Sequence, residues 1–328
     1  MTGRADPAVP CTVHTRLGAD ALEILARHWP ALYAQDRVAT PFQSPAWLSG
    51  HARLLPVRAV PLLLTATTAG GRIIAALALA RLRSRARTQI LPLSAPHATQ
   101  VRLTGPHADN EAVARALALH LLLLHDTGAD LALPGVRADT AFGRAVRTVV
   151  QDNLLTDASP PPVLALPFHA DALAPSRRRE HARRCRHWAQ LAASRPVTYR
   201  RSHHQQALLD GLRVLAALQQ TCPAGPGAAD TIPWRRIVPD IGATGAFVAD
   251  LHIDGAPVAA QLCLTRQHRC YSAAQITHPA YRHIAPAHAL LRHLLDDLAH
   301  EGFHTFDPGR GTRPAATTAP GPPIRLAA

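Results

Sequence analysis

The sequence predicts a mixed α/β protein built from two similar halves. Stretches with the apolar spacing of helices alternate with β-type runs along both halves of the 328-residue chain. Two hairpin signals, at Gly70-Gly71 and at Asp254-Gly255, each join apolar runs of strand type. The proline run at 160–162 separates the two alternating patterns, so we expect a boundary there.

In the first half, the apolar spacing predicts an amphipathic helix over 19–34. Ser44 followed by Pro45 is typical of the start of a second helix. Further along we expect the hairpin over 61–83, a helix over 109–124 and a short strand over 129–136.

In the second half, a strand over 163–168 precedes a helix that begins in an arginine-rich run and is ended by Pro196. The remaining expected elements follow in order: a strand over 197–201, a helix over 205–220, a loop over 221–240, three strand-like runs over 245–276, a helix over 285–302 and a strand that begins at 303. The segment after Gly311 has the composition of a disordered tail. We therefore expect domains at 1–160 and 161–311 and a tail at 312–328.

The charge balance predicts attraction to phosphate-bearing partners. The formal net charge is +13, and all 35 basic residues are arginines, against 22 acids. Five cysteines without a close CxxC pair argue against a disulfide framework. The N-terminal residues lack an apolar h-region, so we expect no signal peptide, and the longest apolar stretch, 116–125, is too short to span a bilayer. We expect a soluble cytoplasmic protein with no membrane insertion.

The run APSRRREHARRCRHW, residues 174–188, contains six arginines within ten residues. At helical spacing Arg179, Arg183 and Arg186 lie on one face, with Trp188 and several alanines (Ala182, Ala189, Ala192) on the other. One interpretation is a solvated face of a structural helix. The other is a contact for the phosphates of tRNA or of a cosubstrate, which guanidinium groups suit well.

Metal binding and serine hydrolysis are not expected. His181, Cys185 and His187 are near one another in the sequence but do not share one helix face, and no second ligand pair is evident. A GxSxG nucleophile elbow is absent from the sequence.

Six segments resemble a known family, in the right order, over roughly 40–311. They are TPFQSPAWL, GRIIAALALARLR, SRRREHARRCRHWAQLAASRPVTYR, DGAPVAAQLCL, YSAAQITHPAYRHIAPAHALL and FDPGRG. Together they are similar to the CelD/BcsL-type acetyltransferases of the GNAT superfamily, which are double-GNAT proteins related in fold to Fem-type aminoacyl-tRNA-dependent transferases. The resemblance implies two tandem GNAT-like domains and acyl transfer as the reaction.

The resemblance also implies where an acyl donor binds. In GNAT enzymes the donor lies where neighbouring strands splay, and its pyrophosphate meets amides at the start of the following helix. Mapped here, the splayed strand is 257–264. The donor-binding residues are then Ala260, Gln261 and Leu262 on that strand, and Arg282, Ala285, Ala287 and His288 in the loop and helix.

Two departures from the family pattern keep other functions open. Ala285 and Ala287 stand where the loop usually has glycine or another small residue, and no Tyr-Lys follows FDPGRG. The charge and the missing glycines favour an aminoacyl-tRNA donor, whereas the family resemblance favours acyl-CoA. The altered C-terminal motif also leaves room for a non-catalytic double-GNAT scaffold.

Acyl transfer needs a polarised carbonyl, a neutral amine and a proton for the leaving group. Asp307 is the candidate acceptor of the amine proton, and Tyr271 the candidate donor to the leaving group; His252 and His278 are further candidates. Each has a structural alternative: Asp307 as a turn carboxylate paired with Arg310, and Tyr271 as a half-buried sheet residue.

Gln275 and Arg310 are candidates for substrate binding, although Gln275 also fits a purely polar strand position. The leading hypothesis is therefore an N-acyltransferase that moves an acyl group from acyl-CoA to a small-molecule amine, without a metal. An aminoacyl-tRNA donor is the alternative.

Overall fold

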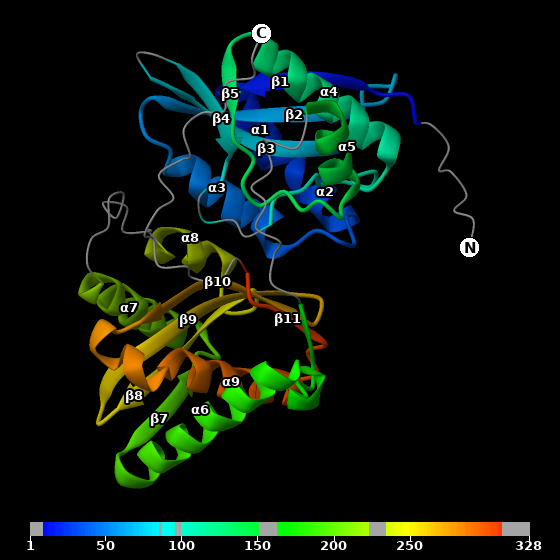
Figure 1. Cartoon of the computed structure of the whole chain (residues 1–328). Coiled ribbons are helices and arrows are strands. Elements are labelled where there is room, and N and C mark those ends of the chain that lie inside the picture. The colour runs from blue at the N-terminus through cyan, green and yellow to red at the C-terminus, as the bar shows by residue number, and fades with distance from the viewer. Residues whose placement is uncertain are drawn as a thin grey trace. The chain divides into compact units, whose positions relative to one another are not determined.

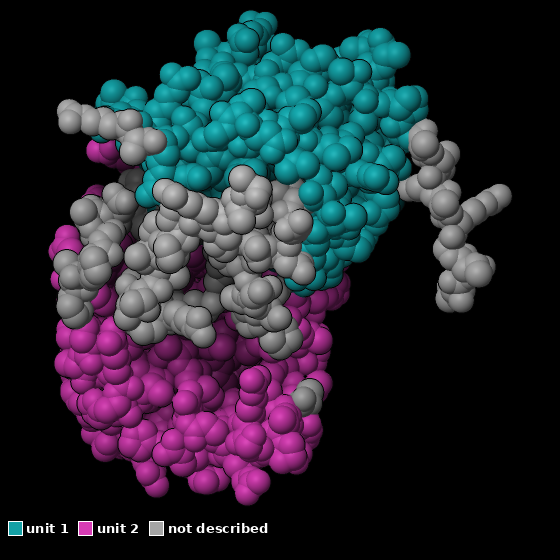
Figure 2. Space-filling model, turned by 45° about the horizontal axis from the view of Figure 1, so that its top comes forward, with its two compact units in different colours: residues 1–159, 321–328 teal, residues 160–320 magenta. Residues whose placement is uncertain are grey.

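The computed structural model describes residues 9–84, 87–95, 97, 100–150, 163–222 and 234–309. The chain divides into two compact units, the first within residues 1–159 and the second within 160–320 (Figure 2). Each unit has one mixed β-sheet with helices packed against it (Figure 1). Among the described helices, none combines the length and the apolar character needed to cross a membrane.

The sheet of the first unit has the strand order β1-β2-β3-β4-β5. These strands are β1 (Thr12–Leu17), β2 (Ala59–Thr67), β3 (Ile73–Arg83), β4 (Thr88–Pro92) and β5 (Ala129–Leu131). The helical elements are α1 (Ala19–Arg27), α2 (Trp29–Gln35), the 3-10 turn η1 (Pro41–Gln43), α3 (Pro45–Arg53), α4 (Glu111–Asp126) and α5 (Ala141–Val150). The helix predicted over 19–34 is two helices, because Pro30 cannot continue α1 and instead occupies the first turn of α2.

The sheet of the second unit has the strand order β6-β11-β10-β9-β8-β7. These strands are β6 (Leu164–Ala165), β7 (Val197–Arg201), β8 (Ala246–Ile253), β9 (Ala256–Arg266), β10 (Arg269–Thr277) and β11 (Thr305–Asp307). The helical elements are η3 (Ala170–Ala172), α6 (Pro175–Ser194), α7 (Gln205–Thr221), α8 (Trp234–Ile241), η4 (Pro279–Ile284) and α9 (Pro286–His300).

The two units share one chain topology, which confirms the prediction of two similar mixed α/β halves. In each unit one strand, β1 or β7, is followed by helices and then by three consecutive antiparallel strands; the second unit has β6 and α6 in addition, before β7. A long helix, α4 or α9, then leads to a last strand that pairs in parallel with the preceding one. A parallel pair needs such a crossover helix, since a tight turn cannot join its ends.

Helices cover both faces of the second sheet. Ala249, Leu251 and Cys263 belong to an apolar core shared with α9 and with Trp188 of α6. Alternate strand residues face the other way, and there Gly211 of α7 lies directly against Val248 of β8. Trp188 is buried, which confirms the inward orientation predicted for it, whereas Ala189 and Ala192 are exposed.

The hairpin predicted at Asp254-Gly255 is present, and both residues have positive φ, 51° and 80°. The loop predicted over 221–240 is wrong for its last part, where α8 forms. Trp234, Ile237 and Val238 bury the apolar side of that helix. Pro239 lies inside this short helix, and the many prolines and glycines of 221–240 are typical of a loop.

Candidate active site

The ladder between β10 and β11 is short and leaves an opening, the outer edge of β10 beyond Tyr271. These parallel strands pair over three positions only, and the last pair is Tyr271 with Asp307. Strand β10 continues to Thr277, still paired with β9 on its other side. Among the described residues, the outer edge of β10 beyond Tyr271 therefore has no strand partner.

The sequence-based placement of the opening beside β9 is wrong. Ala260 pairs with Asp250 of β8 and with Ile276 of β10, and Gln261 and Leu262 also have register partners on both sides. The backbone of these three residues is thus part of a closed ladder. The reason is topological: β9 is held by hairpin neighbours on both sides, whereas β11 reaches β10 only through the α9 crossover.

A β-bulge lies next to the opening. Ser272 pairs with Cys263 and Ala274 pairs with Leu262, so Ala273 is an extra residue with no partner in the β9 register. A bulge leaves a peptide unit out of the ladder and re-aims the strand. This bulge comes two residues after the last β10–β11 pair, which places an unladdered peptide unit at the unpaired edge of β10.

The start of α9 follows β10 through η4. Ala285 is the N-cap of α9, in the left-handed region at φ 50°, and gives no side-chain cap. Its own N–H donates to Arg282 O at 3.1 Å, and the His288 N–H donates to Ala285 O at 3.0 Å. The predicted amides of Ala285 and His288 are therefore engaged within the loop. The Ala287 N–H has no hydrogen-bond partner in the described structure, and Pro286 has no N–H.

The corresponding helix start in the first unit is closed. Helix α4 has Asn110 as N-cap, and its side-chain oxygen accepts hydrogen bonds from the N–H groups of Ala112 and Val113 at 3.1 and 3.2 Å. Such a cap satisfies the donors that would otherwise face an anion. Of the two equivalent helix starts, only that of α9 lacks a side-chain cap.

Tyr271 and Asp307, the two predicted catalytic residues, lie side by side at the opening. Both are buried, and they are register partners across β10 and β11. Burial raises the pKa of Tyr271, with Arg269 acting in the opposite direction, so its phenol is protonated at neutral pH. Asp307 Oδ1 accepts a hydrogen bond from the Gly309 N–H at 2.8 Å, which gives this carboxylate a turn-stabilising role as well.

The other predicted polar residues have partners of their own. Gln275 Nε2 lies 3.4 Å from Gln261 Oε1 on the neighbouring strand, and donates to it. His252 Nε2 is 2.5 Å from Asp250 Oδ1, with both side chains buried. His278 caps η4 by accepting the Ala280 N–H at 3.2 Å. Arg310 lies outside the described residues.

The arginines of α6 are exposed but not all unpaired. Arg183 and Arg184 both bind Glu180, at 2.9 and 2.6 Å. Arg179 makes only a 3.4 Å contact from its Nε to Pro175 O, and Arg186 has no partner in the described structure. The helix keeps six arginines against one glutamate, so its outer face remains strongly positive.

Comparison with known proteins supports a GNAT domain in the second unit. Residues 176–315 match the family model of the acetyltransferase (GNAT) domain, which is less than half of the chain. The sequence matches none of the curated proteins with which it was compared.

Three solved structures are among those with similar folds. They are the C-terminal domain (DUF2156) of a protein named as a lysylphosphatidylglycerol synthetase from Agrobacterium fabrum (TM-score 0.49, 13% identity, 88% of this chain and 79% of that one), FemX (0.47, 11%, 90% and 88%), and a tandem GNAT protein from the clavulanic acid biosynthesis pathway (0.47, 15%, 90% and 89%). TM-scores below 0.5 do not by themselves establish a relationship. The family match and the shared topology do support one statement: the chain has two GNAT-like mixed α/β units, and the second contains the matched acetyltransferase domain.

Proposed function

We propose that the second unit is an N-acyltransferase that moves an acyl group from an acyl-CoA thioester to a small-molecule amine. The observation that carries this proposal is the uncapped start of α9, in the same crossover that leaves the edge of β10 beyond Tyr271 without a strand partner among the described residues. The match to an acetyltransferase domain over 176–315 supports it. On the six sequence segments described above, we assign the chain to the CelD/BcsL type, and we place it in the cytoplasm, where acyl-CoA is made.

The residues at the opening suit the steps of acyl transfer. The peptide unit at Ala273 polarises the thioester carbonyl while the amine nitrogen attacks its carbon. Asp307 takes the proton that the amine loses. The carbon–sulfur bond then breaks, and the neutral phenol of Tyr271 gives a proton to the leaving thiolate.

The phosphates of the donor bind at the start of α9. The Ala287 N–H is available there, and the partial positive charge of the helix N-terminus favours an anion. Arg282 is exposed in the preceding turn and adds a full positive charge.

The substitution Ala287→Asp tests this placement. An acidic residue in the first helical turn stabilises α9 but repels phosphate, so we expect weaker CoA binding with no loss of thermal stability. Ala193→Asp, at an exposed position about 12 Å along α6 from Cys185, is the matched control and keeps its CoA affinity. Isothermal titration with CoA and acetyl-CoA measures both. Equal affinity in the two variants, or no binding by the wild type, contradicts the proposal.

An aminoacyl-tRNA donor is the second candidate, favoured by the positive outer face of α6. Arg179→Glu with Arg186→Glu reverses two charges there without breaking the pairs at Glu180. Arg235→Glu with Arg236→Glu makes the same charge change on α8, where both residues are exposed. If tRNA is the donor carrier, only the α6 pair abolishes a tRNA-induced thermal shift that is strong at low salt. A chain that responds to neither CoA nor tRNA is instead a non-catalytic scaffold.

A further inference from the structure

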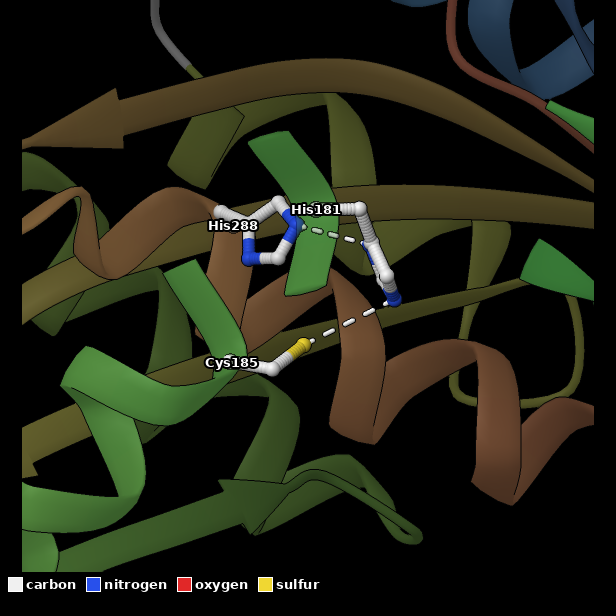
Figure 3. Close-up of side chains that lie close together, drawn as sticks. All are labelled: His181, Cys185 and His288. Atoms are coloured by element: carbon white, nitrogen blue, oxygen red, sulfur yellow. Dashed lines mark hydrogen bonds between the residues drawn. The ribbon is translucent and has the colours of Figure 1, made fainter. Parts of the chain in front are cut away.

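Three potential metal ligands from two helices meet in the second unit. His181 and Cys185 are four residues apart on α6, so they lie one above the other on one helix face. His288 comes from the first turn of α9, which packs against α6. Figure 3 shows the three side chains turned toward one another. His187, which the sequence suggested as a neighbour, is exposed and is not part of this cluster.

The distances fit the ligand shell of a small cation. Cys185 Sγ is 3.6 Å from His181 Nε2, and His181 Nδ1 is 3.0 Å from His288 Nε2. One ligand atom from each residue can be chosen so that all three lie within 4.8 Å of one another. In a tetrahedral zinc site, bonds of roughly 2.0 Å to nitrogen and 2.3 Å to sulfur place N and S about 3.5 Å apart. The His181–Cys185 pair already has that spacing, and rotation of the imidazole rings brings the third ligand closer.

The donor set and its surroundings select the type of ion. Two imidazoles and one thiolate are ligands that zinc and related transition metals prefer, whereas calcium and magnesium prefer oxygen. All three side chains are half-buried, and the Phe168 ring packs edge-on against His181 at 5.9 Å.

Charged side chains of both signs lie near the cluster. Arg184 and Arg292 act on His288 with one sign and Glu180 with the other. Arg184 is bound to Glu180 at 2.6 Å, which neutralises part of the positive charge there. A cysteine ligates a metal as its thiolate, so metal binding at this cluster releases a proton.

We propose that His181, Cys185 and His288 bind one transition-metal ion of the zinc class, with three protein ligands and one coordination position left open. This site goes beyond the proposed acyl transfer and does not depend on it. Because His288 is in the first turn of α9, a bound ion would join α6 to the start of that helix.

Cobalt(II) spectroscopy on tag-free full-length protein tests the proposal. We expect one equivalent of Co²⁺ to give the absorption of a four-coordinate ion together with a thiolate-to-cobalt charge-transfer band, and Zn²⁺ to displace it. Cys185→Ser removes the charge-transfer band, while Cys222→Ser, at another half-buried cysteine, and His187→Ala keep it. Loss of a direct ligand should weaken Zn²⁺ binding by more than the roughly 10–100-fold typical of outer-shell partners.

A second measurement needs no variant and so does not depend on how a variant folds. Alkylation by iodoacetamide, mapped cysteine by cysteine with mass spectrometry, is compared with and without Zn²⁺. We expect Zn²⁺ to protect Cys185 and to leave Cys222 unchanged. Equal alkylation of Cys185 in both conditions, or a cobalt spectrum unaffected by Cys185→Ser, overturns the proposal. Neither readout involves CoA or transferase activity.

Discussion

The left-handed backbone at Ala285 makes a stability prediction whose size follows from the structure. Ala285 joins η4 to α9 with φ 50° and ψ 55°. For an L-residue with a β-carbon this conformation costs about 1–2 kcal/mol, whereas glycine adopts it freely. The greater freedom of glycine in the unfolded chain removes about 0.4–1 kcal/mol of that gain. Ala285→Gly should therefore stabilise the start of α9 by about 1 kcal/mol.

The neighbouring alanine provides a control of opposite sign. Ala287 lies in the first turn of α9, with no left-handed backbone to relieve. Glycine in a helix is less stable than alanine by roughly 0.5–1 kcal/mol, so Ala287→Gly should destabilise the same helix.

Hydrogen exchange of the α9 amides in the full chain measures both variants. A gain of about 1 kcal/mol corresponds to exchange about fivefold slower in Ala285→Gly, and Ala287→Gly should exchange faster than the wild type. Faster exchange in Ala285→Gly would refute the reasoning, because it would mean that the methyl group contributes more than the backbone strain removes.

Three further predictions concern buried residues. Burial, and then His97, lower the pKa of His51 from 6.5 to about 3, so the unfolded chain binds this proton first as the pH falls. The contribution of His51 to the free energy of unfolding is complete above pH 6.5 and is lost between pH 6.5 and 3, with about 2 kcal/mol lost at pH 5. His51→Leu should therefore reduce the acid sensitivity seen in urea titrations, and an unchanged pH profile in this variant would contradict the prediction. In Gly211→Ala the new β-carbon would lie 2.7 Å from Val248 Cβ, so we expect the free energy of unfolding in urea to fall by about 1–3 kcal/mol. Adding Val248→Ala should restore part of this loss. An unchanged free energy of unfolding in Gly211→Ala would mean that α7 shifts without cost. Tyr271→Phe should lower kcat by about 10²-fold while CoA affinity stays the same, and an unaltered kcat would remove the phenol from the proton transfer.

Local patterns in the sequence were sufficient for most elements of the fold. The turn at Asp254-Gly255 needs positive φ at both residues, and this pair of residue types supplies it, so the hairpin was predictable. Helix α8 was missed because the many prolines and glycines of 221–240, with Pro239 inside the helix itself, predict a loop despite the helical spacing of Trp234, Ile237 and Val238. The short helix is stable because those residues are buried against the rest of the unit, which the local sequence does not show.

The site was predicted less well, since its geometry depends on contacts between distant parts of the chain. Tyr271 and Asp307 were predicted as catalytic residues, and the structure places them next to each other, while their roles stay predictions. The predicted position of the opening was wrong by one strand. Helix α9 connects β10 to β11, and the point at which β11 meets β10 after this crossover cannot be read from local sequence. The third potential metal ligand, His288, is 107 residues from His181, and no spacing rule connects them.

The side chain of Asn110 has a consequence for stoichiometry. The amides of Ala112 and Val113 are already occupied, so of the two topologically equivalent helix starts only that of α9 fits the proposed donor phosphates. Under the proposed function, a calorimetric titration with acetyl-CoA should therefore reach saturation at one equivalent per polypeptide.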